Sequence, residues 1–318
     1  MNSLEQFSVF IEEHCSKYPF KKEPSNLYDP LRYFMTLGGK RMRPILTLMG
    51  AEMFGIKKEE SIYAALAIEF FHNFSLIHDD IMDVAPLRRG KETVHEKWNT
   101  NVAILSGDAL FVEAFQNLAK YPDDRLPLLL KKFNDTALEV CEGQQMDMDF
   151  ETKATVSADE YLEMIRLKTS VLLGCAFEFG AILGRQNEEI RSRLYNFGVS
   201  LGIAFQIQDD ILDLYADPEK FGKQVGGDIL SNKKTLLLIH AFETRDHRVA
   251  DLIAMEANPA KIETAKVLLA ELGCVETVSL VKEKYHQEAL RELDTLGVLG
   301  LNVQPLRALS EYLLIRER

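Results

Sequence analysis

Several features that mark other protein classes are scarce or missing in this chain of 318 residues. No apolar run is long enough to cross a membrane, and the glycine-rich motifs of nucleotide-binding loops are missing. The first residues lack the basic segment and apolar core of a secretory signal. These absences predict a cytoplasmic protein without a transmembrane segment.

Cysteine and positive charge are also in short supply. The four cysteines, Cys15, Cys141, Cys175 and Cys274, are scattered and form no C-x-x-C pair, which favours reduced core thiols over disulfides or a zinc site. Lys and Arg number 37 against 49 Asp and Glu, and the net charge of -12 argues against nucleic acid as the main partner.

Helical periodicity dominates what is present. It is clear over residues 61–76, 159–173, 190–214 and 262–271, whereas alternating strand patterns are hard to find. A hydrophobic content of 47% is enough for one large domain or two ordinary ones. No segment has the composition of an interdomain linker. We therefore expect an all-α fold, a helical bundle of one domain spanning residues 1–318.

Part of the negative charge lies in two aspartate motifs with the same pattern, D-D-I-x-D. They occupy Asp79–Asp83 and Asp209–Asp213, each after apolar residues that suit a buried helix. The first and last carboxylates of each motif, four residues apart, share a helix face. One such motif is as often a solvated acidic turn, but two in apolar helices call for cations. Without His or Cys at ligand spacing, we expect magnesium first and calcium second.

Basic residues around the first motif indicate a polyphosphate ligand. Segment Gly38–Pro44 places three positive charges after two glycines, and Lys40 and Arg43 can share a helical face while Arg41 points elsewhere. The pair Arg88–Arg89 offers forked donors for phosphate oxygens. Each feature alone is more often surface charge. Together they predict a site in which the aspartates bind metal ions and the basic side chains neutralise the remaining phosphate charge.

These motifs, in this order, resemble the trans-type isoprenyl diphosphate synthases, the polyprenyl synthetase family. The resemblance runs from about residue 31 to 237 and includes Gly143–Asp147, Lys168-Thr169, and the residues after the second motif. It implies an isoprenoid synthase fold, all-helical around a central cavity, and usually a homodimer. The implied reaction joins an allylic diphosphate, after loss of diphosphate, to isopentenyl diphosphate, followed by proton loss. The departing diphosphate is the expected proton acceptor.

The resemblance also implies roles for individual residues. Direct ligands of Mg2+, three ions per site, are expected to be Asp79, Asp83 and Asp209. Aspartates acting through water or as hydrogen-bond acceptors are expected to be Asp80, Asp210 and Asp213. The isopentenyl diphosphate pocket is matched by Lys40, Arg43, His72 and Arg89. The allylic diphosphate pocket is matched by Arg88, Lys168, Lys223 and Lys233. Residues facing the ionising carbon are Lys168, Thr169 and Gln206.

Two of these assignments have simpler alternatives, and a third depends on a choice between neighbouring lysines. His72 alone would fit a satisfied core histidine, and Thr169 could bond back within its own helix. Lys233 is preferred to Lys234 because it matches the family's K-x-T spacing before Thr235. The family often has glycine before that lysine, where this chain has Asn232.

A helix stripe of Phe71, Phe74 and Ser75 is the expected floor that stops chain elongation. At about 1.5 Å per residue, these side chains lie roughly 6–12 Å before Asp79. The pattern favours geranylgeranyl diphosphate (C20) as product, with farnesyl diphosphate (C15) next; both phenylalanines could instead be ordinary core. Other readings are a longer-chain polyprenyl diphosphate synthase, a class I terpene cyclase, a catalytically silent partner subunit and a structural calcium-binding protein.

Overall fold

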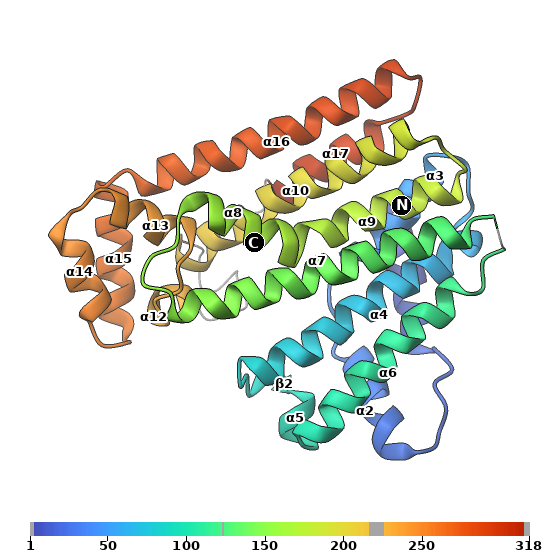
Figure 1. The fold of residues 1–318 in the computed structure, drawn as a ribbon, viewed down its shortest axis with the longest axis horizontal. Helices are drawn as coiled ribbons and strands as arrows, with labels where there is room; N and C mark the ends of the chain where they lie inside the picture. The colour runs from blue at the N-terminus through green and yellow to red at the C-terminus, as the bar shows by residue number, and fades with distance from the viewer. Residues whose placement is uncertain (1–2, 123, 216–225, 315–318) are drawn as a thin grey trace. The chain divides into compact units, whose positions relative to one another are not determined.

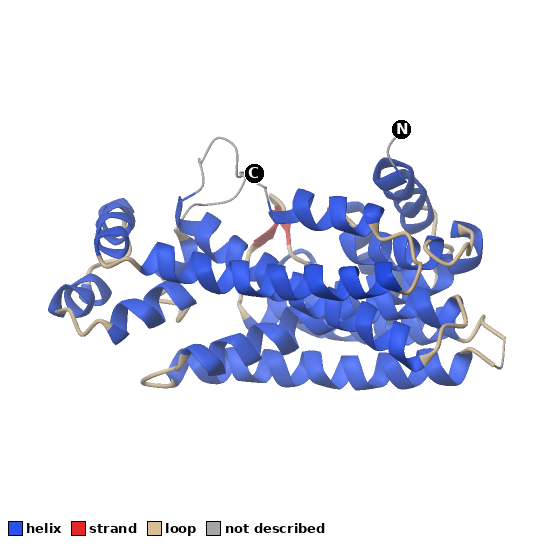
Figure 2. Cartoon of the chain, turned by 90° about the horizontal axis from the view of Figure 1, so that it is seen from above, coloured by secondary structure: helices blue, strands red, loops and turns tan. Residues whose placement is uncertain are grey.

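The computed structural model describes residues 3–122, 124–215 and 226–314, and most of them are helical (Figure 1). Figure 2 shows one small two-stranded hairpin amid helices, β1 (Leu87–Arg88) paired antiparallel with β2 (Lys91–Glu92). The prediction of an all-α fold is confirmed. No helix of the described residues is long and apolar enough to span a membrane.

The chain divides into two compact units, and three helices contribute residues to both units. Unit 1 comprises Met1–Ala137 and Cys175–Ser192, and unit 2 comprises Leu138–Gly174 and Arg193–Arg318. The boundaries fall inside α7 (Leu126–Thr152), α9 (Val171–Leu183) and α10 (Glu188–Tyr215). The single domain expected from the sequence stays a prediction.

Unit 1 is built around a long central helix. Its helices are α1 (Ser3–Ser16), α2 (Ser25–Thr36), α3 (Met42–Glu52), α4 (Lys58–Met82), α5 (Val94–Lys97) and α6 (Thr100–Leu118), with parts of α7, α9 and α10. Helix α4 packs against α6 and α3. Glu59 and Glu60 stand in its first turn, where carboxylates suit the helix dipole. Its middle is buried, and it delivers the first aspartate motif at its C-terminal end.

Unit 2 contains the second aspartate motif at the end of α10. Its other elements are α8 (Ala158–Ile165), the π-helical turn η1 (Arg166–Ser170), α12 (Gly227–Leu230), α13 (Leu236–Glu243), α14 (His247–Ala254), α15 (Pro259–Glu271), α16 (Cys274–Val298) and α17 (Gln304–Leu314). A capping box between Ser157 and Glu160 starts α8. Asn258 caps α15 ahead of Pro259. One apolar cluster joins α8, α10, α13, α15 and α16.

Close helix packing explains the glycines that the sequence concentrates in these helices. A Cβ on Gly180 would lie 2.3 Å from the Gly50 carbonyl carbon, so α9 and α3 meet backbone to backbone in unit 1. In unit 2, a Cβ on Gly198 would lie 2.7 Å from Gly174 Cα. All four cysteines are free thiols, as expected. The expectation that all four lie in the core is wrong for Cys141, which is exposed on α7.

Candidate functional site

The first aspartate motif begins where α4 ends. Asp79 is half-buried, Asp83 is exposed as the C-cap residue, and the Asp83 amide donates to the Asp79 carbonyl at 2.9 Å. Asp80 points the other way, with a side chain that is only 1% exposed. The helix therefore presents Asp79 and Asp83 outward and keeps Asp80 inside. This division agrees with the predicted roles, which stay predictions because no metal contact is shown.

Arg88 holds the inward aspartate. Its Nε lies 2.8 Å from each Asp80 carboxylate oxygen, and its Nη2 lies 2.7 Å from Oδ1. Burial raises the pKa of Asp80, and Arg88 opposes that rise. The same guanidinium lies 3.6 Å from Asp79. Arg88 was assigned to the allylic diphosphate, and the structure places it on the first aspartate motif.

A tight hairpin brings Arg89 to the glycine-led segment. Arg89 and Gly90 have φ of 53° and 76°, the pair of positive values that a two-residue type I′ turn needs. The Arg89 guanidinium donates to the Gly38 carbonyl. A Cβ on Gly39 would lie 2.6 Å from Arg89 Nη1, so glycine is needed there to admit the side chain.

Arg41 anchors the same segment from the inside. Arg41 has φ of 47° and is 4% exposed. Its guanidinium donates to Glu69 at 2.6 Å, Glu12 at 3.1 Å and the Met35 carbonyl at 2.6 Å. The expectation that Arg41 points elsewhere is confirmed. The expectation that Lys40 and Arg43 share a helical face is wrong, because the left-handed Arg41 delays the start of α3 to Met42 and leaves Lys40 outside it.

Arg43 and His72 are brought together as the sequence predicts. Arg43 Nη1 lies 3.1 Å from His72 Nε2. Arginine can only donate, so Nε2 accepts and the imidazole is neutral. Burial, together with the charges of Arg43, Arg89, Arg88 and Arg41, lowers the pKa of His72 well below its usual value. A neutral His72 can still donate one hydrogen bond, through Nδ1.

The second aspartate motif repeats this division on α10. Asp209 and Asp213 are half-buried, and Asp210 is buried. Asp210 accepts hydrogen bonds from the Tyr161 hydroxyl and from Gln206 Nε2, the latter at 3.0 Å. Burial and the nearby charge of Asp228 raise the pKa of Asp210 to about 7. Asp213 Oδ2 accepts the Asp228 amide at 3.1 Å, which ties the motif to the start of α12.

Lys168 and Thr169 lie in the π-helical turn η1, a feature that the periodicity does not reveal. Lys168 Nζ lies 2.5 Å from Asp147 Oδ2, and Lys233 Nζ lies 4.0 Å from the same oxygen. A Cβ on Gly143 would lie 2.2 Å from the Lys168 amide nitrogen, so glycine lets α7 approach the turn. The Gly143–Asp147 element was noticed in the sequence, but Asp147 was not assigned a role.

The Thr169 side chain points from η1 toward Gln206 on α10. Its hydroxyl lies 3.4 Å from Gln206 Oε1, a long hydrogen bond. The back-bond foreseen as the alternative for Thr169 is made one residue later, from Ser170 to the Ile165 carbonyl at 3.2 Å. Lys168, Thr169 and Gln206 therefore lie close together in unit 2. Of the residues assigned by the sequence, Lys223 lies outside the described residues.

The residues predicted to stop chain elongation belong to an aromatic cluster in unit 1. Phe74 stacks on Phe111 with ring centroids 4.9 Å apart, and Phe71 lies 5.5 Å from Phe111 and 5.4 Å from Phe133. Phe70 turns to the opposite side and meets Tyr18 at 4.6 Å. Ser75 donates to the His72 carbonyl at 2.9 Å.

Across the described ranges, no group of three His, Cys, Asp or Glu side chains gathers closely enough to hold a metal ion. The donors at each aspartate motif are carboxylate oxygens, which suit magnesium that keeps waters and shares substrate phosphates. Residues Asp79, Asp83 and Asp209 fit such a role chemically.

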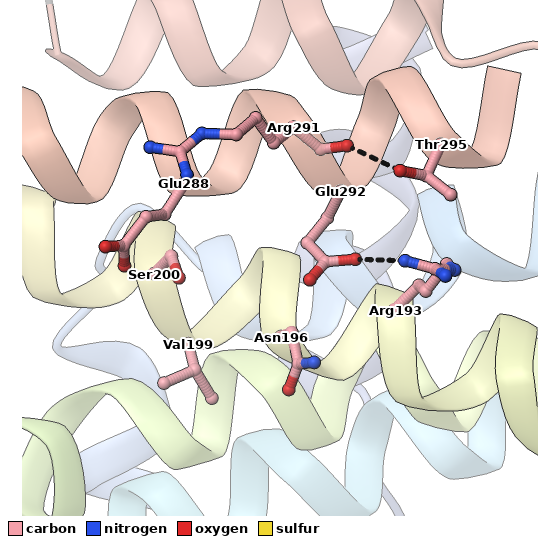
Figure 3. A pocket seen from close by; sticks show the side chains of 8 residues that line it. All are labelled: Arg193, Asn196, Val199, Ser200, Glu288, Arg291, Glu292 and Thr295. Atoms are coloured by element: carbon pink, nitrogen blue, oxygen red, sulfur yellow. Dashed lines mark hydrogen bonds and ion pairs between the residues drawn. The ribbon is translucent and has the colours of Figure 1, made fainter.

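A polar cleft of about 490 Å³ lies elsewhere in unit 2, between α10 and α16 (Figure 3). Arg193 on one wall pairs with Glu292 on the other at 3.2 Å. The Arg291 carbonyl accepts the Thr295 hydroxyl at 3.0 Å. The cleft carries none of the residues assigned above.

Comparison with known proteins gives consistent results. The family model for polyprenyl synthetase matches residues 24–272. A geranylgeranyl diphosphate synthase from Methanosarcina mazei is 39% identical over 296 residues, 92% of this chain and 91% of that protein. A geranylfarnesyl diphosphate synthase from Natronomonas pharaonis is 36% identical and covers 95% of this chain and 91% of its own. A crystal structure of a geranylgeranyl pyrophosphate synthase superposes with a TM-score of 0.93 at 44% identity, covering 99% of this chain and 98% of that one.

Proposed function

This chain belongs to the polyprenyl synthetase family, and we propose that it condenses isopentenyl diphosphate with an allylic diphosphate to make geranylgeranyl diphosphate. The observation that carries the proposal is the same arrangement of exposed and buried carboxylates at both aspartate motifs. Each presents carboxylates on one helix face while a buried aspartate fixes the neighbouring side chains. The first motif lies in unit 1 and the second in unit 2.

The basic side chains supply binding and charge compensation. In unit 1, Arg43, His72 and Arg89 lie around the glycine-led segment that carries Lys40, and they would bind isopentenyl diphosphate. In unit 2, Lys168 and Lys233 converge on Asp147 and would bind the allylic diphosphate. Fixed positive charges stabilise the diphosphate as it leaves.

Magnesium bound by Asp79, Asp83 and Asp209 would neutralise further charge on the leaving diphosphate. The allylic carbon becomes positive as its bond to the diphosphate oxygen breaks. The Thr169 hydroxyl and the Gln206 amide oxygen, held together at 3.4 Å, can direct negative dipoles at it. We propose that the departing diphosphate accepts the proton lost after condensation.

The direct test is incubation with isopentenyl diphosphate and each allylic starter, with and without Mg2+. We expect prenyl diphosphates of twenty carbons, formed only with the metal present. Formation of a cyclic hydrocarbon would instead identify a terpene cyclase. No turnover by the isolated chain, restored by a partner subunit, would identify a silent subunit.

Lys168→Ala and Gln206→Ala should separate binding from ionisation. Lys168→Ala removes a charge that meets diphosphate, so KM for the allylic substrate should rise and kcat should fall. Gln206→Ala removes a dipole that matters as charge develops, so kcat should fall roughly 10- to 100-fold with little change in KM. Steady-state kinetics with farnesyl diphosphate measures both. Gln206→Ala also frees Asp210, so circular dichroism must confirm the fold, and normal kcat would refute the role of Gln206.

The homodimer expected for the family has a candidate surface on α6. Ile104, Leu105 and Val112 are 39%, 60% and 53% exposed, and Leu105 and Val112 are seven residues apart on one helix face. Exposed apolar side chains that form a contiguous patch can mark a protein interface. We propose that two copies of the chain meet at this face.

Leu105→Lys should convert the dimer to a monomer, because a charge in the centre of an apolar interface is left unpaired. Light scattering coupled to size exclusion measures the mass. Leu280→Lys is the matched control, since Leu280 is a leucine 72% exposed on α16. A dimer that survives Leu105→Lys would place the interface elsewhere.

A further inference from the structure

Among the described residues, the side-chain partners of a buried lysine near the start of α15 are all neutral oxygens. Lys261 is 1% exposed. Its ammonium donates to Asn232 Oδ1 at 2.7 Å, the Met255 carbonyl at 3.2 Å and the Ile253 carbonyl at 3.4 Å. These three acceptors match the three N–H donors of a lysine. Burying a charge is costly unless its hydrogen bonds are satisfied, so the surroundings of Lys261 are ordered around it.

The residue that Lys261 holds most closely has an unusual backbone. Asn232 has φ of 55°, in the left-handed region that disfavours most side chains and that asparagine tolerates best after glycine. Its amide also donates to the Ile253 carbonyl at 3.4 Å. Asn232 is therefore fixed at both ends of its side-chain amide, by α15 and by the end of α14. In Figure 1, α14 and α15 lie side by side.

The fixed backbone at Asn232 leads directly into Lys233. The Lys233 amide donates to the Asp228 carbonyl at 2.8 Å, and its ammonium lies 4.0 Å from Asp147. Helix α15 also supports the beginning of this segment, because a Cβ on Gly226 would lie 2.7 Å from Ile262. The side chain of Lys233 is 45% exposed. The backbone conformation at Asn232 helps to set where the Lys233 side chain leaves the chain.

We propose that Lys261 is a positioning residue for the allylic diphosphate, acting through Asn232 to aim Lys233. The proposal rests on the proposed function, which assigns Lys233 to that diphosphate. A glycine before Lys233 would adopt the left-handed conformation freely. Asparagine at this position holds it through the Lys261 contact, so the two residues work as a pair.

The test compares Lys261→Met, Asn232→Gly and the double variant in the full-length protein. Methionine keeps the length and apolar stem of lysine but cannot donate. Glycine keeps the left-handed backbone but loses the anchor. Binding is measured by calorimetry with Mg2+ and an allylic thiolodiphosphate, whose sulfur bridge resists ionisation. Steady-state kinetics gives KM for both substrates, and Lys266→Met, on the same helix but paired with Glu263, is the matched control.

We expect Lys261→Met and Asn232→Gly each to weaken analogue binding and raise the allylic KM about 10-fold, since small misplacements of a binding group have effects of this order. The KM for isopentenyl diphosphate should stay within about 2-fold, because Lys261 and Asn232 contact Ile253 and Met255 and not the proposed pocket residues Arg43, His72 and Arg89. The double variant should be no worse than Lys261→Met, because both changes break one contact. Lys266→Met should match the wild type.

Three outcomes would overturn the proposal. Wild-type analogue binding by a folded Lys261→Met would show that Lys233 does not depend on it. An equal rise in both KM values, with a lowered Tm, would show a role in general stability only. A wild type that binds the analogue but forms no product would refute the proposed reaction while leaving the binding comparison decisive. A wild type that does not bind it would refute both.

Discussion

Asp79→Ala and Asp209→Ala should each lower turnover by roughly 10²-fold or more while leaving the fold intact. Each removes a carboxylate that we assign to magnesium, and the charge on the leaving diphosphate then lacks compensation. Neither aspartate is buried, so no core cavity is created. Initial rates at saturating Mg2+ and both substrates measure the effect, and circular dichroism checks the fold.

Asp135→Ala is the control for these variants. Asp135 is an exposed aspartate on α7 that pairs with Lys131, so its loss should leave turnover unchanged. EDTA should abolish wild-type activity, and added Mg2+ should restore it. Mg2+ with diphosphate should also raise the Tm of the wild type but not of Asp79→Ala, because a ligand that binds the folded state stabilises it. Activity that persists in EDTA would contradict the metal assignment.

The fold class and the main motifs could be predicted from the sequence because they depend on local patterns. Apolar residues at helical spacing gave the long helices, including the two that end in aspartates. The prediction that Asp80 and Asp210 differ from their neighbours also follows from helix periodicity, since residues one apart face different sides. The structure places both inside, with Arg88 and Tyr161 as partners.

Features that depend on contacts between distant segments could not be predicted. Arg41 adopts a left-handed backbone because Glu69, 28 residues away, and Glu12 receive its guanidinium. Nothing within the Gly38–Pro44 segment signals this conformation, so helix spacing was wrongly applied to Lys40 and Arg43. The π-helical turn at Lys168 is similar, because it lies where Gly143 of α7, a distant segment, approaches the backbone of Lys168.

Asp147 shows a further limit. A lone carboxylate among the acidic residues of α7 carries no local signal of its function. Its role becomes visible when Lys168 and Lys233 are seen to converge on it. The pairing of Asn232 with Lys261 is hidden for the same reason, because 29 residues separate the two partners.

Phe74→Ala should lengthen the product by at least one five-carbon unit. Phe74 lies five residues before Asp79, about 7.5 Å along α4, and its ring stacks on Phe111. Removing the ring opens space where the tail of a growing chain would end. Phe71→Ala, a further turn down, should extend the product only when Phe74 is also replaced. Products are extracted, dephosphorylated and sized as alcohols.

Phe70→Ala provides the matched control on the same helix. Phe70 and Phe71 are 0% and 1% exposed, so each substitution should cost a similar amount, about 3–5 kcal/mol. Phe70 packs on Tyr18 and Phe20, away from the cluster of Phe71 and Phe74. A product change caused by general loosening would appear in Phe70→Ala as well. A change caused by the floor would appear in Phe74→Ala and the Phe71/Phe74 double variant alone, and unchanged products in both would show that these rings are ordinary core.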